Sequence, residues 1–261
     1  MAAVAGSDLA IRLLPRLIQP ATEVAIVSPT YSSHEKAWTA AGHRVRFVSE
    51  PSQIGPYGIG VVVNPNNPDG RRWPAATLAA AAARLTDRGG FLLVDEAFGD
   101  VTPELSVLRF AGDFSRIIVL RSFGKFYGLA GLRLGFVATA HPLGQALVAT
   151  LSDWPVSGPA VAIGRAALAD HVWAGETLAR LGETAVRLDA ALKGAGFEII
   201  GGTSLFRLTR HPDATRIFER LAHHGILVRP FADSSVLRFG LPAGDKQFTR
   251  LAQALKSEHR A

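Results

Sequence analysis

Short apolar runs, rich in valine, leucine and isoleucine, recur through the N-terminal half of the chain, and turn-forming or charged residues bound each of them. Such runs are typical of strands buried on both faces of a sheet. Helical patterns lie between several of them, most clearly at Leu9–Ile18 and at the alanine-rich Pro74–Arg88. Strands that alternate with helices predict an α/β fold, with a mostly parallel sheet sandwiched by helices. The predicted strands are Val24–Val27, Val45–Val48, Gly60–Val63, Phe91–Val94, Ile117–Leu120 and Leu134–Val137.

The pattern changes after about Pro159. Val161–Leu192 has long apolar-periodic stretches, which predict one long helix or two stacked helices. Shorter elements of mixed type follow. We therefore predict a large domain over residues 1–160, and a connecting helix with a smaller α+β domain over residues 161–261. The predicted elements of the smaller domain are strands at Phe197–Ile200, Leu205–Leu208, Ile226–Val228 and Val236–Phe239, and helices at Ala214–His224 and from Asp245.

Composition excludes several classes of protein. The 261 residues include no cysteine, which rules out disulfides and thiolate metal sites and favours the cytoplasm, and we predict no metal site. No apolar stretch is long enough to span a membrane, and no leader sequence is visible. The net charge is +6, but Arg71-Arg72 is the only adjacent basic pair, so we predict neither a nucleic-acid partner nor a membrane partner.

Polar segments follow three of the predicted strands at the point where each strand ends. These segments are Asn64–Gly70, Asp95–Phe98 and Arg121–Lys125. Ligands of open α/β sheets bind outside the carboxyl ends of the strands. We therefore expect the three segments to face one crevice.

These segments offer the groups that a phosphorylated pyridine aldehyde would need. A lysine amine must form the imine, and Lys125 suits that role. A carboxylate must keep the ring nitrogen protonated so that the ring can accept electrons, and Asp95 suits that role. Asn67, in a proline-rich turn, could donate a hydrogen bond to the phenolic oxygen. The pattern thus predicts catalytic roles for Lys125 and Asp95.

The phosphate group would need hydroxyls, an arginine and the amides at a helix start. Ser122 and Arg133 supply the first two, and Gly6-Ser7-Asp8 opens the helical pattern at Leu9.

Each of these residues also has a simpler interpretation. Lys125 could be a surface lysine, and Asp95 could cap the turn after its strand. Asn67 could serve turn chemistry only, and Gly6-Ser7-Asp8 could be an ordinary helix N-cap. We favour the cofactor roles because the serine, lysine, arginine and glycine occur together at fixed offsets.

The run Ser122-x-x-Lys125-x7-Arg133-x-Gly135 resembles the cofactor-lysine motif of the aminotransferase class I/II family of fold-type I pyridoxal-5′-phosphate (PLP) enzymes. Asn67-Pro68-x-Gly70 and Asp95 resemble the family's residues at the phenolic oxygen and at the pyridine nitrogen. The resemblance implies PLP as cofactor and an aspartate aminotransferase-like large domain. It also implies a homodimer.

The resemblance suggests further site residues. Tyr31 falls where the family has an aromatic ring stacked on the cofactor, and His34 falls where some members hold a histidine behind the aspartate. Arg238 resembles the arginine that binds the substrate carboxylate. Packing, a surface histidine and an exposed salt bridge are the respective simpler alternatives.

Two more arginines, Arg207 and Arg229, lie near strands of the predicted smaller domain and could bind a substrate phosphate. A solvated surface position is the alternative for both.

The chain departs from the family pattern in two places. Phe98 stands where many relatives carry a tyrosine hydrogen-bonded to the cofactor, so we expect that bond to be absent. Relatives also carry several dozen residues ahead of the Gly6-Ser7-Asp8 motif. We therefore expect either a fragment that lacks an N-terminal segment or a protein with an incomplete site.

Within the family, Asp95–Phe98 and Arg121–Arg133 look most like the threonine-phosphate decarboxylases of cobalamin biosynthesis, and histidinol-phosphate aminotransferases come next. This implies a small phosphorylated amino acid as substrate. We expect decarboxylation of O-phospho-L-threonine to (R)-1-aminopropan-2-yl phosphate. The alternatives are a transaminase, in which Lys125 moves a proton between Cα and the cofactor's C4′, and an inactive PLP-binding protein.

Overall fold

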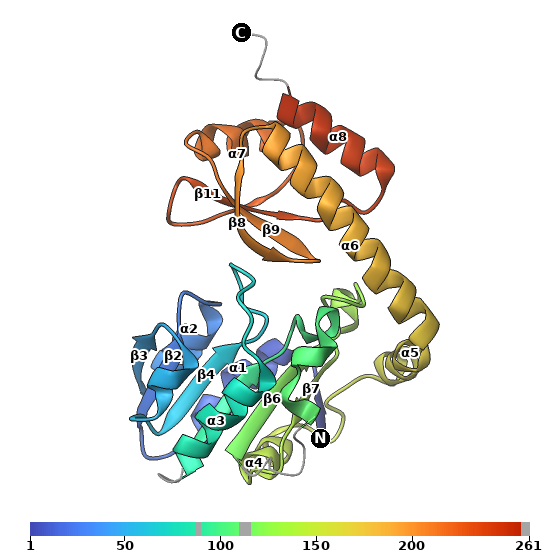
Figure 1. The fold of residues 1–261 in the computed structure, drawn as a ribbon. Helices are drawn as coiled ribbons and strands as arrows, with labels where there is room; N and C mark the ends of the chain where they lie inside the picture. Colours follow the sequence, from blue (N-terminus) through green and yellow to red (C-terminus); the bar gives the residue numbers. More distant parts are fainter. Residues whose placement is uncertain (87–89, 110–115, 257–261) are drawn as a thin grey trace. The chain divides into compact units, whose positions relative to one another are not determined.

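The computed structural model describes residues 1–86, 90–109 and 116–256 (Figure 1). The chain folds into two compact units. The large unit comprises Met1–Asn67 and Arg71–Ala169, and the small unit comprises Pro68–Gly70 and Asp170–Ala261. The boundary that the sequence predicts near residue 160 lies inside helix α5 (Gly158–Ala169). The longer segment of the small unit begins at Asp170, whose carboxylate accepts a hydrogen bond from the Trp173 amide and caps the next helix.

A seven-stranded sheet forms the centre of the large unit, in the order β1-β7-β6-β5-β4-β2-β3. Strands β2 to β6 are parallel, whereas β7 and β1 are antiparallel to their neighbours, so the prediction of a mostly parallel sheet is confirmed. The strands are β1 (Ala2–Val4), β2 (Glu23–Val27), β3 (Arg44–Val48), β4 (Ile59–Val63), β5 (Phe91–Asp95), β6 (Ile117–Ser122) and β7 (Gly135–Ala138).

Apolar side chains cover both faces of this sheet. Alternate residues of a strand point to opposite faces, so Leu92 and Val94 of β5 pack in one cluster while Leu93 packs in the other. Helix α3 (Ala75–Thr86) supplies Leu78 to the first cluster. Helices α1 (Ser7–Leu13), α2 (Ser33–Ala40) and α4 (Leu143–Thr150) contribute to the second cluster.

Two helices of the large unit differ from their predicted bounds. The run Leu9–Ile18 is not one helix, because α1 ends at Leu13 and a 3-10 turn follows at Leu14–Leu17. Pro15 has no N–H to donate, so the α-helical hydrogen bonds cannot continue through it. The prediction Pro74–Arg88 corresponds to α3, and residues 87–89 lie outside the described part of the chain.

The small unit contains a four-stranded antiparallel sheet in the order β10-β11-β9-β8. Its core joins the sheet to the three helices of this unit, for example through Leu188, Ile217 and Phe239. The elements are α6 (His171–Gly194), β8 (Glu198–Thr203), β9 (Phe206–Arg210), α7 (Ala214–His223), β10 (Arg229–Pro230), β11 (Val236–Gly240) and α8 (Asp245–Lys256).

One strand prediction in the small unit is wrong. Ile226–Val228 is not a strand, and the strand there is only Arg229–Pro230. Ile226 and Val228 are apolar because they pack against the core of the unit, not because they pair with another strand.

Pro68–Gly70 packs against β8. The Gly202 amide donates a hydrogen bond of 2.8 Å to the Asp69 carbonyl, at a point where the β8–β9 register is irregular. A Cβ at Gly201 would collide with the Asp69 carbonyl, and one at Gly70, where φ is 72°, would collide with the Gly202 carbonyl. Glycine is therefore required at both positions for the two backbones to approach this closely.

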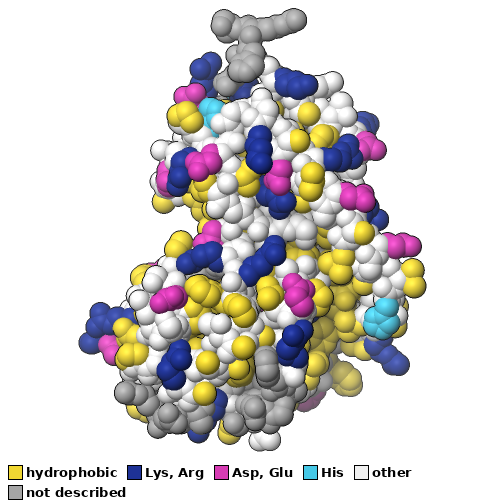
Figure 2. Space-filling model, in the orientation of Figure 1, with side chains coloured by type: hydrophobic (Ala, Val, Ile, Leu, Met, Phe, Trp, Pro, Cys, Tyr) yellow, Lys and Arg dark blue, Asp and Glu magenta, His cyan; other side chains and the backbone are white. Residues whose placement is uncertain are grey.

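Among the helices of the described residues, none combines the length and the apolar character that crossing a membrane would need. On the face drawn in Figure 2, Lys and Arg side chains are interspersed with Asp and Glu side chains and with apolar surface. A dispersed charge of this kind differs from the clustered basic stripe of many nucleic-acid binding proteins.

Candidate active site

Asp95 ends β5, and its side chain is almost completely buried, at 3% exposure. One carboxylate oxygen, Oδ1, accepts a hydrogen bond of 3.0 Å from the Ala97 amide, so Asp95 does cap the turn after its strand. The other oxygen, Oδ2, lies 2.9 Å from Nε2 of His34. A buried carboxylate held by two such contacts has a fixed direction, which a group aimed at one ligand atom requires.

His34 is buried, so the alternative of a surface histidine does not hold. It lies on α2 one turn from Trp38, and both side chains are fully buried. Nε2 faces Asp95, whereas Nδ1 is buried and has no hydrogen-bond partner among the described residues. If Nε2 carries the proton, His34 donates to Asp95 and stabilises the carboxylate charge.

Lys125 lies in the turn after β6 and is exposed. Its ammonium is 5.8 Å from the centre of the Phe98 ring, close enough for a cation–π contact, and Phe98 follows Asp95 by three residues. The structure thus brings the Lys125 amine to the segment that begins with Asp95. The turn itself is closed by a hydrogen bond of 3.1 Å from the Gly128 amide to the Lys125 carbonyl.

Gly6 and Arg133 come together in the large unit. The pairing of β1 with β7 places Val4 opposite Gly135, and β6 places Ser122 opposite the same glycine. A Cβ at Gly6 would lie only 2.6 Å from Nη2 of Arg133. Ser122, Arg133 and the amides at the start of α1 therefore surround one small region.

The backbone of this region adopts uncommon conformations. Gly6 has a φ of 87°, and Arg133 has a φ of 52°, the one positive value recorded for a non-glycine residue in the described chain. Such a conformation costs about 1–3 kcal/mol and is concentrated at functional sites. At Gly135, a Cβ would lie 2.5 Å from the Ser7 amide nitrogen, so a side chain there would displace the start of α1.

The Asp8 side chain is paired with Arg12 and not with a residue of this region. Its carboxylate accepts a hydrogen bond of 2.7 Å from Arg12 Nε, in an exposed pair one helical turn apart.

The segments after β2 and β4 are joined by Asn66, which sequence reasoning did not single out. Its Oδ1 accepts a hydrogen bond of 2.6 Å from the Thr30 hydroxyl, and its Nδ2 donates one of 2.8 Å to the Pro29 carbonyl. The neighbouring Asn67 is half-buried and is the last residue of the large unit before Pro68. Asn66 could have been found from the sequence only by assigning the turn chemistry residue by residue, because the two adjacent asparagines look alike.

Tyr31 is exposed, and its ring lies edge-on to that of His34 with the ring centres 6.3 Å apart. Tyr31 is therefore close to the His34–Asp95 pair, and part of its side chain is exposed to solvent.

The three predicted substrate arginines lie in the small unit and differ in their surroundings. Arg207 donates two hydrogen bonds, of 2.5 and 3.1 Å, to the Asp189 carboxylate of α6, and its charge is therefore already paired. Arg238 and Arg229 lie directly opposite each other on β11 and β10. The Arg238 guanidinium lies 5.0 Å from the Phe206 ring centre.

Electrostatics distinguish the arginines further. The pKa of Arg238 is lowered, first by burial and then by the positive charge of Arg229. Because Leu208 is the cross-strand partner of Arg238, the adjacent Arg207 points to the other face of the sheet. Two neighbouring cations on one face would be stabilised by a bound anion.

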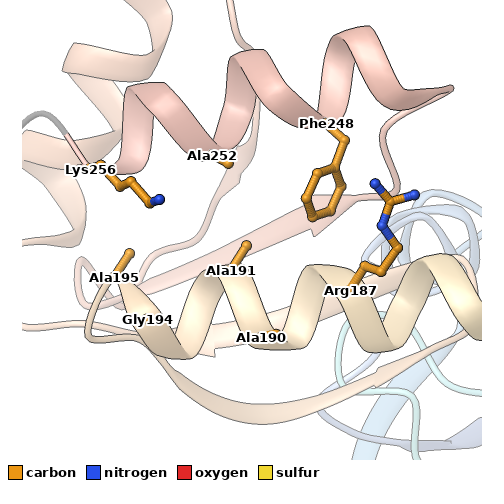
Figure 3. Close-up of a pocket in the computed structure, with 8 residues that line it drawn as sticks. All are labelled: Arg187, Ala190, Ala191, Gly194, Ala195, Phe248, Ala252 and Lys256. Carbon is orange, nitrogen blue, oxygen red and sulfur yellow. The ribbon is translucent and has the colours of Figure 1, made fainter.

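A separate pocket lies between α6 and α8 in the small unit (Figure 3). It has a volume of about 400 Å³, and the Arg187 guanidinium lies over the Phe248 ring at 4.5 Å from its centre. None of the predicted site residues lines it, and the residues that do are Arg187, Ala190, Ala191, Gly194, Ala195, Phe248, Ala252 and Lys256. This pocket is therefore not the candidate active site.

Comparison with known proteins defines the class. The family described as "Aminotransferase class I and II" matches residues 2–255, and the chain belongs to this family. The chain is 46% identical over 257 residues to a threonine-phosphate decarboxylase of a Sinorhizobium species, covering 97% of this chain and 76% of the relative. It is 43% identical over 256 residues to the threonine-phosphate decarboxylase of Pseudomonas aeruginosa, with the same coverage.

A solved structure shows the same fold. Histidinol-phosphate aminotransferase from Sinorhizobium meliloti, in complex with PLP, superposes with a TM-score of 0.85 at 24% identity, covering 98% of this chain and 75% of that chain. The PLP-dependent aminotransferase-like fold predicted from the sequence is therefore confirmed.

Enzymes of this family depend on PLP, and the residues of this chain fit that group. A buried carboxylate with a histidine behind it suits a protonated ring nitrogen. The Lys125 amine lies beside the segment that begins with Asp95, where it could form an imine with the cofactor's aldehyde. At Gly6, where φ is 87°, a side chain would be strained and its Cβ would displace the Arg133 guanidinium, so glycine keeps the backbone amides and this guanidinium together, as a phosphate site requires.

Proposed function

We propose that this chain binds PLP and catalyses the decarboxylation of O-phospho-L-threonine to (R)-1-aminopropan-2-yl phosphate, a step of cobalamin biosynthesis. The observation that carries the cofactor assignment is the buried contact of His34 with Asp95, because Asp95 ends β5 and the neighbouring strand β6 leads to Lys125. The choice of substrate is supported by 46% and 43% identity to two threonine-phosphate decarboxylases over 97% of the chain.

We assign the reactive amine to Lys125 and the ring-nitrogen partner to Asp95. When bound, the cofactor supplies a protonated pyridine ring that accepts the electron pair left at Cα when the bond to the carboxylate breaks. Lys125 would hold the cofactor through its aldehyde and would carry the proton that is delivered to Cα of the substrate. Asp95 holds the proton on the ring nitrogen, and His34 orients Asp95 from behind.

We assign the phosphate of the cofactor to Ser122, Arg133, and the amides of Gly6 and Ser7. Their convergence in the large unit and the crowding at Gly6 support this assignment. Asp8 contributes as the acidic residue of the first turn of α1, where its charge is favourable to the helix.

The remaining cofactor contacts are assigned to two loops. Asn67 donates to the phenolic oxygen, and Tyr31 stacks on the ring. The exposure of Tyr31 and its place beside His34 support the second assignment.

For the substrate we assign the carboxylate to Arg238 and the phosphate to Arg229. The two guanidinium groups stand on neighbouring strands. The pKa of Arg238 is lowered first by burial and then by the charge of Arg229, and a bound anion would offset both effects. Arg207, predicted from the sequence for the same role, would have to give up its ion pair with Asp189 in order to bind an anion. We therefore assign Arg207 to holding β9 on α6.

We further propose that the protein works in the cytoplasm as a homodimer, with a small phosphorylated amino acid and neither a nucleic acid nor a membrane as its partner. The absence of cysteine from the sequence and the family membership support this proposal.

The test is the reaction itself. The purified protein with PLP is given O-phospho-L-threonine without any 2-oxo acid, and release of carbon dioxide is measured. We expect stoichiometric carbon dioxide and aminopropyl phosphate. Turnover that requires a 2-oxo acid, with histidinol phosphate accepted, would instead assign the chain to the aminotransferases, and a PLP-bound protein with neither reaction would reject both activities.

A further inference from the structure

A buried charge network lies directly beside the candidate active site. Glu96, the residue after Asp95, is fully buried. Its carboxylate accepts hydrogen bonds from the Ser106 hydroxyl at 2.6 Å, from the Val107 amide at 2.8 Å and from Nη1 of Arg121 at 3.0 Å. The proposed reaction uses none of these groups.

Arg121 connects two carboxylates in this network. Its Nη1 donates to Glu96 and its Nη2 donates to Asp100, and the Arg121 side chain is only 20% exposed. Burial lowers the pKa of Arg121, but the charges of Asp100 and Glu96 more than offset this, so its pKa lies above the ordinary value. Burial raises the pKa of Asp100 by more than the charge and the hydrogen bond of Arg121 lower it.

Stability alone does not explain this arrangement. Replacing a buried ion pair by well-packed apolar residues of similar volume is often neutral or stabilising. What a planar guanidinium supplies is direction, since its donors are fixed in one plane and can engage two carboxylates at once. The network therefore fixes the relative positions of the segments to which its members belong.

Those segments carry the candidate active-site residues. The parallel pairing of β5 with β6 ends at Asp95 and Leu120, with a last hydrogen bond from the Glu96 amide to the Leu120 carbonyl. Beyond that point β6 pairs only with β7, through Arg121 and Ser122. The side chains of Glu96 and Arg121 thus continue the connection between the two segments where the backbone connection stops.

The far side of the network approaches the Lys125 turn. Tyr127, two residues after Lys125, stacks on Phe123 with ring centres 4.3 Å apart. Burial raises the pKa of Tyr127, and the negative charge of Asp100 raises it further. The charges of Asp100 and Arg121 therefore act on the turn that carries Lys125.

We propose that Arg121 is a positioning residue, which holds the Ser122–Lys125 segment in a fixed relation to the Asp95–Phe98 segment through Glu96 and Asp100. It thereby sets where the Lys125 amine lies relative to the group that Asp95 holds. This inference rests on the proposed function.

The test separates the positive charge of Arg121 from the fixed directions of its hydrogen-bond donors. Arg121→Lys keeps the positive charge but loses the planar pair of donors, so the holoenzyme is expected to fold and to bind PLP. Its kcat is expected to fall on the order of 100-fold with little change in KM, as for a reacting group displaced by about 1 Å. Its PLP absorbance band is expected to titrate at a different pH from that of the wild type. Arg187→Lys is the control, because Arg187 forms an exposed ion pair with Asp245 away from the site, and it is expected to change neither quantity.

A second variant separates positioning from stability. The triple variant Glu96→Gln, Asp100→Asn, Arg121→Met removes every charge of the network. We expect it to unfold at a temperature near that of the wild type, but to have a kcat as low as that of Arg121→Lys. A kcat of wild-type size in either the triple variant or Arg121→Lys would overturn the positioning role while leaving the proposed function intact. A wild-type protein that shows no PLP band would refute the proposed function and the positioning role together.

Discussion

The contact between His34 and Asp95 makes a quantitative prediction for the protein without cofactor. Replacing His34 by leucine removes the partner at 2.9 Å from a carboxylate that is 3% exposed. A hydrogen bond to a charged group contributes about 1.5–3 kcal/mol, so we expect His34→Leu to lower the free energy of unfolding by about 2 kcal/mol. For a chain of about this length, a loss of about 2 kcal/mol corresponds to a fall of about 4–8 °C in Tm.

A double-mutant cycle isolates the contact. Urea unfolding of His34→Leu, Asp95→Ala and the double variant is expected to show a coupling of about 1.5–3 kcal/mol. His43 is the matched control, since it is also buried but its hydrogen bonds go to Thr22 and Pro15. His43→Leu combined with Asp95→Ala should be additive. A His34–Asp95 coupling below about 0.5 kcal/mol would refute the claim that His34 supports Asp95.

Two further predictions concern the large unit. Gly6→Ala is expected to weaken PLP binding at least about 10-fold, because its Cβ would lie 2.6 Å from Arg133 Nη2 and would displace that guanidinium. Gly42→Ala is the control, because Gly42 has nearly the same φ, 88° against 87°, but open space around it. It should cost only about 1–2 kcal/mol of stability and leave the PLP affinity, measured by absorbance titration, unchanged. The raised pKa of Asp100 means that the folded state binds this proton more tightly than the unfolded state, so the stability it contributes is complete below its ordinary value of 3.8 and is lost as pH rises through the folded pKa. Between about pH 4 and pH 7 the free energy of unfolding of Asp100→Asn should therefore rise relative to that of the wild type, and a constant difference would contradict the assignment.

The strands of the large unit could be predicted from the sequence because they are buried on both faces. Every residue of β4 and β5 is buried, so their apolar runs are continuous and start and stop abruptly. The candidate site followed from the same signal, since Asp95 and Lys125 come just after such runs.

Helix α2 could not be predicted in this way. Its eight residues bury only His34 and Trp38, so most of its sequence is polar or small and shows no apolar stripe. The support of Asp95 by a helix side chain was therefore suggested only by resemblance, and its geometry came from the structure.

Side-chain partners distant in sequence were also beyond prediction. Nothing near Arg207 in the sequence indicates that Asp189 would neutralise it, because the pair forms only when β9 packs on α6. The same holds for Glu96 and Arg121, which are 25 residues apart and meet only because β5 and β6 are neighbours.

The attachment of PLP to Lys125 is the claim on which the account depends. The wild-type protein is mixed with PLP, its visible absorbance band is recorded, borohydride is added, and the modified peptide is identified by mass spectrometry. We expect a band that borohydride abolishes, a permanent label on Lys125, and neither band nor label in Lys125→Ala. A label on another lysine, or an unchanged spectrum in Lys125→Ala, would contradict the account.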